Sequence, residues 1–515
     1  MKTFLRKNSA LLITLLAILV FLTVASRDMS TQDFYITLLR SLSAGSVVFL
    51  VAAGFSLIFG LLDVLNLAHG TLYMIGAYIG WTVFVRPDTF VDLLAPALLL
   101  LTGLTLTGAL KKLTSRFTLT PTVRRLSSWG LIAVGVVLAV MILDRFPIAI
   151  WDLDNYARGP VTFSFFADQG MRLPLEHLGF EEISPILALI GLLIASLLYG
   201  TGIALMGGEV RADRKLNLRS FLPFALLVVG AVLVTIFNTQ LTEWLVKIDS
   251  TWLFLVAIIV AIASGVGLGA GMEITLIRPL YSRPIYQLML TLGLSAIGIE
   301  MVQAIWGRPG FIMPRPSIAK GSGEGCPATS LAAWLEHKCA TIQFFDGRIR
   351  VYDEVIIPVL GIIVLIAVWI LLKRTRIGMI IRAGVQDRAM VEALGINVRR
   401  IFTLVFALGV GLATFGGILA APSSGLNTGM GASLLTQALI ALAIGGLTSY
   451  PGAALGSLLV GLVQQFIIKY GQIGIEIPFT DFIFKPTPPL VPASTVLLMV
   501  IVLLFLPGGI MGKKE

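Results

Sequence analysis

Few polar residues of this sequence lie within apolar stretches. The most closely spaced of them are Asp63, Asn66 and His69. They interrupt two apolar runs within residues 54–78, and Gly70 follows directly. A polar break of this kind ends one helix and begins another. The break could line a solute path or only anchor a turn at the cytoplasmic surface, and the residues taken alone favour the turn.

The sequence contains no motif for nucleotide hydrolysis, metal-dependent hydrolysis or covalent catalysis. The GxxxxGK[ST], HExxH, GxSxG and CxxC patterns are all missing. His177 and His337 stand without a second His or Cys at ligand spacing, so we expect both at the surface. We therefore expect no enzymatic activity, metal or cofactor in this chain, and any energy must be supplied from outside it.

Residues 373–400 are a basic, helix-prone loop between two stretches of almost pure hydrocarbon. Its only acids are Asp387 and Glu392, which leaves a formal balance of seven minus two, or +5. The seven cations are Lys373, Arg374, Arg376, Arg382, Arg388, Arg399 and Arg400. Acids kept within so basic a loop indicate helix caps or specific contacts with a partner.

Apolar residues recur in this loop at a four-residue spacing, which predicts short amphipathic helices. They are Ile377, Ile381 and Val385, then Met390 and Leu394. Asp387 can cap the second helix, and Gly395 can end it in a left-handed conformation. Such helices could receive a soluble partner or lie on lipid headgroups, and the residues alone favour neither.

Composition predicts a polytopic membrane protein. The mean hydropathy is +0.93, with 57% hydrophobic and only 13% charged residues. About fourteen apolar segments are long enough, or nearly so, to cross a bilayer. They centre near residues 17, 52, 77, 100, 136, 196, 229, 262, 297, 363, 411, 441, 461 and 500. We therefore expect an all-α membrane bundle of about 14 segments, some of them half-helices.

The net charge of +10 does not indicate nucleic-acid binding, because the cations cluster in alternate short loops. This positive-inside pattern places both termini and the 373–400 loop in the cytoplasm of a bacterial inner membrane protein. The N-terminal segment also resembles a secretory signal peptide, although its long apolar run favours an uncleaved span. Residues 144–184, 307–354 and 469–493 then lie outside. Cys326 and Cys339 share one of these loops, where a disulfide is favoured over a free buried pair.

Many of the 52 glycines fall inside the expected spans, where they lower helix propensity. Gly265, Gly267, Gly269 and Gly271 form overlapping GxxxG pairs. Glycines at this spacing allow close helix packing in a membrane. A channel or transporter would use such packing, though a rigid bundle would show the same pattern.

Several ordered motifs closely resemble the permease subunits of branched-chain amino acid ABC importers of the LivH type. The stretch GFSLIFGLLDVLNLAHGTLYMIGAYIGW resembles that family's GxxLIFGxxxxxNxAHGxxYMxGAY region. EITLIRPLYSRP, the 374–409 stretch, GGLTSYPGAALG and the terminal LFLPGGIMG follow in the family's order. EITLIRP departs from the family by an isoleucine in place of its first arginine. The resemblance covers roughly residues 34–84 and 251–515.

The resemblance implies that the 373–400 loop contacts the ATPase, with Arg382, Asp387, Arg388, Glu392 and Gly395 as its coupling residues. Asn66, His69 and Gly70 match the family motif at a helix break, with a role in the pathway open. The implied partners are a second homologous permease subunit, two cytoplasmic ABC ATPase subunits, a periplasmic substrate-binding protein and membrane lipid. ATP is used by the partner subunits, and this chain needs no cofactor.

The cargo and the transport mode have alternatives. Permeases for urea or short-chain amides share these motifs, and a self-sufficient channel or secondary carrier would transport without an ATPase. The expected organisation is an N-terminal span at 1–33, permease core at 34–84 and 251–515, and an inserted region at 85–250. The insertion carries four apolar segments, an even number, so it returns the chain to the same side. No residue pattern in the insertion indicates a catalytic or binding function.

Overall fold

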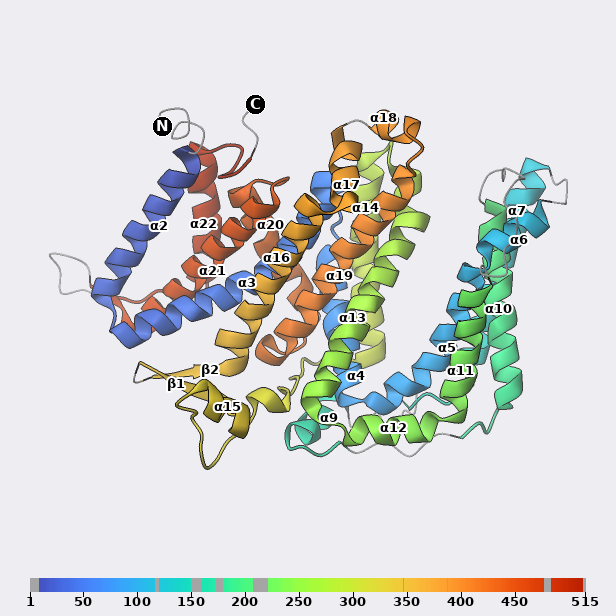
Figure 1. Cartoon of the computed structure of the whole chain (residues 1–515), viewed down its shortest axis with the longest axis horizontal. Coiled ribbons are helices and arrows are strands. Elements are labelled where there is room, and N and C mark those ends of the chain that lie inside the picture. The colour runs from blue at the N-terminus through green and yellow to red at the C-terminus, as the bar shows by residue number, and fades with distance from the viewer. Residues whose placement is uncertain are drawn as a thin grey trace. The chain divides into compact units, whose positions relative to one another are not determined.

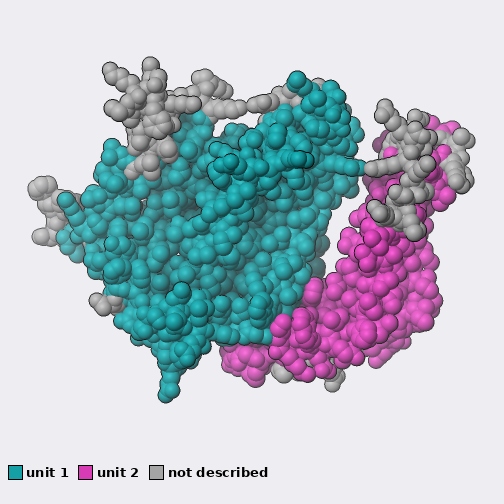
Figure 2. All heavy atoms as spheres, in the orientation of Figure 1, with its two compact units in different colours: residues 1–84, 249–515 teal, residues 85–248 magenta. Residues whose placement is uncertain are grey.

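The computed structural model describes residues 9–115, 120–149, 159–172, 179–206, 221–345, 347–386, 388–476 and 483–512. These residues are predominantly helical, and strands occur among them only as two short antiparallel hairpins. The chain divides into two compact units, residues 1–84 with 249–515 and residues 85–248 (Figure 2). The predicted all-α membrane bundle is confirmed.

The larger unit, hereafter unit 1, is a bundle of long helices with a small outer subdomain (Figure 1). Its helices are α2 (Ser9–Asp28), α3 (Thr31–Leu62), α4 (His69–Val85), α13 (Ser250–Met272), α14 (Pro284–Trp306), α15 (Leu331–His337), α16 (Ile357–Arg374), α17 (Arg376–Gln386), α18 (Arg388–Ala393), α19 (Val398–Ser424), α20 (Met430–Gly445), α21 (Tyr450–Ile473) and α22 (Leu490–Phe505). Short π and 3-10 turns join them: η3 (Glu273–Ile277), η4 (Arg278–Leu280), η5 (Ser317–Ala319) and η6 (Val351–Ile356).

The smaller unit, unit 2, is also helical. It comprises α5 (Pro87–Thr105), α6 (Thr107–Thr114), α7 (Pro121–Leu143), α9 (Gly159–Asp168), α10 (Pro185–Met206), α11 (Leu222–Ile236) and α12 (Asn238–Lys247). Its core is built on α10, where the Thr102 hydroxyl lies 2.7 Å from that of Ser196, and Ser128 donates to the Gly202 carbonyl at 2.6 Å. These buried hydroxyls are satisfied within the unit, which therefore has its own packed interior.

Each of the expected apolar centres falls inside a helix. Within the described ranges, however, only nine helices are long and apolar enough to cross a membrane, or ten if the bent pair α11 and α12 is one span. Ile18–Arg27, Met430–Gly445 and Leu490–Phe505 are apolar but shorter. The count of about fourteen crossings therefore stays a prediction, since apolar length alone does not distinguish a full span from a short buried helix.

The core of unit 1 is the crossing of α3 and α19. These are the most enclosed of the long helices, because 72% and 83% of the residues in their apolar 18-residue stretches are buried. A Cβ atom on Gly54 would lie 2.3 Å from the Gly409 carbonyl oxygen, so the two backbones are in direct contact. Gly461 brings α21 equally close to α3, since its Cβ would lie 2.4 Å from the Ser41 oxygen. Glycine in these spans thus serves close packing.

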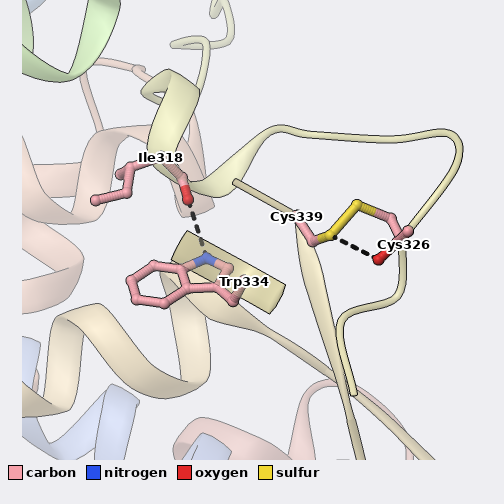
Figure 3. The surroundings of a disulfide bond; sticks show 5 residues. Ile318, Cys326, Trp334 and Cys339 are labelled. Atoms are coloured by element: carbon pink, nitrogen blue, oxygen red, sulfur yellow. Dashed lines mark hydrogen bonds between the residues drawn. A yellow bond between two sulfur atoms is a disulfide. The ribbon is translucent and has the colours of Figure 1, made fainter. Parts of the chain in front are cut away.

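An outer subdomain forms around the antiparallel strands β1 (Thr341–Phe344) and β2 (Gly347–Arg350), in which Thr341 pairs with Arg350. A second hairpin joins β3 (Ile475–Glu476) to β4 (Ile483–Phe484). Cys326 and Cys339 are joined in a disulfide, and nearby the Trp334 indole nitrogen donates to the Ile318 carbonyl at 3.0 Å (Figure 3). The disulfide cross-links the loop between η5 and β1 and so restricts its unfolded conformations.

Asp249 fastens this subdomain to the start of α13. Its carboxylate accepts from the Thr251 amide at 2.8 Å and the Ser317 hydroxyl at 2.7 Å, and pairs with Lys338 at 3.2 Å. Burial by itself would raise the pKa of this carboxyl, but the donors from Ser317, Thr251 and Lys338 hold the pKa well below its ordinary value. The carboxylate is therefore ionised at neutral pH and caps α13.

The two ends of unit 1 differ in character. Helices α17 and α18 lie at the upper end in the view, the end at which α2 also begins, whereas β1, β2 and α15 lie at the opposite end (Figure 1). We call these the loop end and the hairpin end. Helix α19 runs from the loop end at Val398 to the hairpin end at Ser424.

Close packing of α13 on α19 generates the first prediction. A Cβ atom on Gly265 would lie 2.2 Å from the Thr414 hydroxyl, whereas one on Gly267 meets nothing within 4 Å. Gly265→Val should therefore destabilise the protein by about 1–3 kcal/mol through overpacking. Gly267→Val, the matched control on the same helix, should change the unfolding temperature in detergent little. Equal destabilisation by both variants would show that helix propensity, not packing, sets the cost.

Candidate functional site

The 373–400 loop folds into two helices, α17 and α18, whose inner residues are inserted into unit 1. Ile381 is buried with Leu57 of α3 and Val405 of α19. Val391 is buried with Val398 and Phe402 of α19. The loop is therefore seated on the ends of the two core helices rather than lying loosely over them.

The outer face of the loop is apolar and basic. Met379, Met390 and Leu394 are 60%, 65% and 73% exposed, and Arg382 is exposed beside them in sequence. The apolar residues that recur at the four-residue spacing therefore lie in two environments. Ile381 is buried, whereas Met390 and Leu394 are exposed. Exposed methionine and leucine flanked by cations form a surface suited to an apolar, acidic partner.

Gly395 ends α18 with φ +79°, the left-handed conformation expected from the sequence. Its amide donates to the Glu392 carbonyl at 3.0 Å, and the Ile396 amide donates to the Val391 carbonyl at 3.4 Å. These bonds satisfy the last carbonyls of the helix. Glu392 is exposed on the same short helix. Asp387 and the side chain of Arg388 lie outside the described part, so the cap at Asp387 stays a prediction.

A buried carboxylate, that of Glu273, is hydrogen-bonded to the part of α19 on which the loop packs. Glu273 is fully buried and pairs with Arg278 at 2.6 Å, as its position in the sequence indicates. It also accepts hydrogen bonds from the hydroxyls of Thr403 and Tyr281, each at 2.7 Å. Arg278 donates to the Thr403 oxygen at 2.6 Å, and the Tyr281 ring lies 6.1 Å edge-on from Phe402.

This network ties η3 and η4 to α19 directly beneath the loop. The sequence places Glu273 close to Arg278, five positions away. It does not indicate Thr403, which lies 130 positions away on another helix. The carboxylate has four donors and is fully satisfied, which a buried charge requires.

The helix break lies at the same end. Helix α3 ends at Leu62, Asp63 adopts the left-handed conformation with φ 54°, and α4 begins at His69. Leu62 packs against both clusters that hold the loop. The Leu67 amide donates to the Thr291 hydroxyl of α14 at 3.2 Å. The break therefore supplies part of the seat of α17 and α18.

Asn66 and His69 are fully buried inside this break. The Asn66 side-chain oxygen accepts from the Ala68 amide at 3.1 Å, and His69 Nε2 lies 3.2 Å from the Val51 carbonyl oxygen. Asn66 Nδ2 and His69 Nδ1 have no hydrogen-bond partner among the described residues. Gly70 packs on α20, where an added Cβ would lie 2.3 Å from the Gly431 oxygen. The buried Asn66 and His69 side chains therefore keep this turn inside the packed interior of unit 1.

Comparison with known proteins identifies relatives of one kind. A family described as branched-chain amino acid transport system / permease component matches residues 224–507, more than half of the chain. The branched-chain amino acid permease BraD of Pseudomonas aeruginosa is 31% identical over 171 residues, 33% of this chain and 51% of BraD. The LivH permeases of Escherichia coli K12 and Salmonella typhimurium are each 26% identical over 271 residues, 52% of this chain and 78% of LivH. No solved structure matches the chain significantly.

The Glu273 network generates the second prediction. Thr403→Val removes a donor to Glu273 and an acceptor for Arg278, so it should lower the unfolding free energy by about 1–3 kcal/mol. The control is Thr275→Val on η3, because the exposed Thr275 hydroxyl donates to the Gly271 carbonyl one turn back, at 2.7 Å, and bonds no other described residue. Thermal unfolding in detergent measures both. If the two variants unfold alike, the network does not hold α19 in place.

Proposed function

Because this chain belongs to the permease family of branched-chain amino acid transport systems, we propose that it is the membrane-spanning permease subunit of an ATP-binding cassette importer. The proposed cargo is a branched-chain or related amino acid, delivered by a periplasmic binding protein. The observation that carries the proposal is the 373–400 loop, anchored inward on α3 and α19 and exposing apolar and basic residues outward. A membrane span alone would not need such a loop.

The proposed partners are a second homologous permease, two cytoplasmic ABC ATPases and a periplasmic substrate-binding protein. In this proposal the chain is not an enzyme, and ATP hydrolysis takes place on the ATPase subunits. The outer face, with Met379, Met390 and Leu394 exposed, is the surface offered to an ATPase. The formal charge of +5 on residues 373–400 favours an acidic contact surface on that partner.

The loop's inner contacts provide a route for mechanical coupling. Movement of α17 displaces Ile381, which lies between Leu57 of α3 and Val405 of α19. Movement of α18 displaces Val391, which packs on Phe402. The two helices so engaged meet through Gly54 and Gly409 without intervening side chains. A packed core transmits such a displacement rather than absorbing it.

The proposed location is a bacterial inner membrane with both termini in the cytoplasm. The alternation of basic loops supports this orientation, as does the disulfide at the hairpin end, since disulfides persist in an oxidising compartment. The loop end would then face the cytoplasm, and the hairpin end would face the periplasm.

Two other functions would use the same bundle differently. An importer of urea or short-chain amides would keep every subunit and change the binding protein. A self-sufficient channel or secondary carrier would transport without an ATPase. ATP-dependent uptake separates the last alternative from the others, and the ligand of the binding protein encoded with this chain separates the first two.

The orientation generates the third prediction. Reporter fusions after Arg283 or Arg400 should be active as cytoplasmic reporters, and fusions near Ser322 should be active as periplasmic ones. Alkaline phosphatase and green fluorescent protein activities in intact cells measure the two outcomes. A periplasmic signal at Arg400 would reverse the scheme and leave the loop beyond the reach of an ATPase.

The coupling loop generates the fourth prediction. Gly395→Val places a β-branched residue at φ +79°, and Glu392→Lys inverts the charge of an exposed acid, so both should disturb docking of the ATPase. In proteoliposomes containing the whole transporter, we expect at least tenfold lower uptake and loss of the ATPase response to loaded binding protein. Insertion and thermal stability of the chain should remain near those of the unaltered protein.

Gly395→Asn is the matched control, because asparagine tolerates the left-handed conformation, and it should retain most of the uptake. If the loop instead lies on lipid, Glu392→Lys should strengthen contact with anionic headgroups and leave transport intact. Normal uptake by both Gly395→Val and Glu392→Lys would contradict the coupling role.

A further inference from the structure

A cavity of about 350 Å³ lies toward the hairpin end of unit 1. Its wall combines residues 40–47 of α3, residues 350–357 from the end of β2 through η6 to the start of α16, and the last turn of α19, with one residue each from α4, α20 and α21. Its volume falls within the range typical of small-molecule sites, at the lower end. No sequence motif indicates this site, because its lining residues come from six segments that are far apart in the chain.

Charged side chains of both signs line the cavity. Arg40 and Arg350 supply two cations, and Asp353 and Glu354 supply two anions. Glu354 is 1% exposed and accepts from Arg40 Nε at 3.0 Å and from the Arg350 backbone amide. Asp353 accepts from Arg315 at 2.8 Å and from the Ser423 hydroxyl, and pairs with Arg350 at 3.3 Å. A site that presents both signs of charge matches a zwitterion.

Arg40 retains hydrogen-bonding capacity toward the cavity. Its side chain is 39% exposed, and within the described structure only its Nε atom donates a hydrogen bond. The two Nη atoms are therefore available as a fork, the geometry that binds a carboxylate through two bonds. The hydroxyls of Tyr73 and Ser43 and the amide of Gln465 also line the cavity, and these groups make no hydrogen bond with a described residue.

The rest of the wall is aliphatic. Ala44 and Val47 of α3, Ile357 of α16 and Leu434 of α20 supply it. An aliphatic side chain of a ligand would lose its hydration there, which favours binding. Urea or a short amide carries no charged groups and little aliphatic surface, so it would gain less from the charged side chains and from this apolar wall.

We propose that this cavity is a transit site for the zwitterion of an aliphatic amino acid, entered from the hairpin end. Its carboxylate accepts from the Arg40 Nη pair, and its ammonium group lies against the carboxylates of Glu354 and Asp353. Its side chain packs on Val47 and Ile357. This assignment rests on the proposed function as an amino acid importer and adds the site within the permease that distinguishes amino acids from neutral amides.

Uptake of radiolabelled leucine into proteoliposomes containing the whole transporter tests the role of Arg40. Arg40→Gln should reduce uptake at least tenfold, while the ATPase response to loaded binding protein stays within twofold. Lys469→Gln is the matched control, because Lys469 pairs with Asp33 between α21 and α3 at 2.6 Å but does not line the cavity. Its uptake should stay within twofold. Unchanged uptake by Arg40→Gln would overturn the assignment.

A second measurement reports binding without transport. The only two cysteines of the chain form the disulfide, so Ser43→Cys introduces a single free thiol into the cavity wall. Millimolar leucine should slow alkylation of this thiol by a maleimide at least threefold, and Arg40→Gln should abolish the protection. Urea at the same concentration should not protect.

The combined outcomes separate the two proposals. Protection by leucine without ATP-dependent uptake would uphold the cavity and refute the importer. Uptake of leucine without protection would uphold the importer and refute the cavity. Equal protection by leucine and urea would refute the assignment to a zwitterion.

Discussion

The contact on which the rest of unit 1 depends is the backbone crossing of α3 and α19 at Gly54 and Gly409. In hydrocarbon, two helices gain little by exchanging lipid for each other, so they associate where their backbones can approach closely. An added Cβ at either glycine would lie within 2.7 Å of the opposing carbonyl oxygen, so neither position can carry a larger residue without moving a helix. Helices α13 and α21 then pack on this pair through further glycines.

The same crossing places the two candidate functional regions at opposite ends of one rigid pair. At the loop end, Ile381 of the 373–400 loop packs against Leu57 and Val405. At the hairpin end, Arg40 of α3 and Ser423 of α19 line the charged cavity. The proposed coupling would act through the same two helices that contribute residues to the cavity wall. The proposed coupling and the proposed transit site share this mechanical element.

Buried charge is used differently at these two ends. Glu273 is enclosed by four donors from Arg278, Thr403 and Tyr281, so its role is to hold the helices that seat the loop. Glu354 is equally buried, but Arg40 bonds it through Nε alone, and neither Nη atom of Arg40 donates a hydrogen bond within the described structure. A fully satisfied pair rigidifies its surroundings, whereas a pair with unused donors can bind a ligand. The distinction lies in the partners, not in the residue types.

The sequence alone determined the membrane class, the positions of the helices, the left-handed Gly395 and the family, because hydropathy, glycine and motif order are local properties. It could not decide that Ile381 turns inward while Met390 stays exposed, or that Thr403 joins Glu273. Those outcomes depend on which helices meet, and helices α3 and α19 are more than three hundred residues apart in the chain. The cavity also depends on which helices meet, since its Arg40 and Glu354 are separated by 314 positions in the sequence. Only tertiary packing brings such residues within hydrogen-bonding distance.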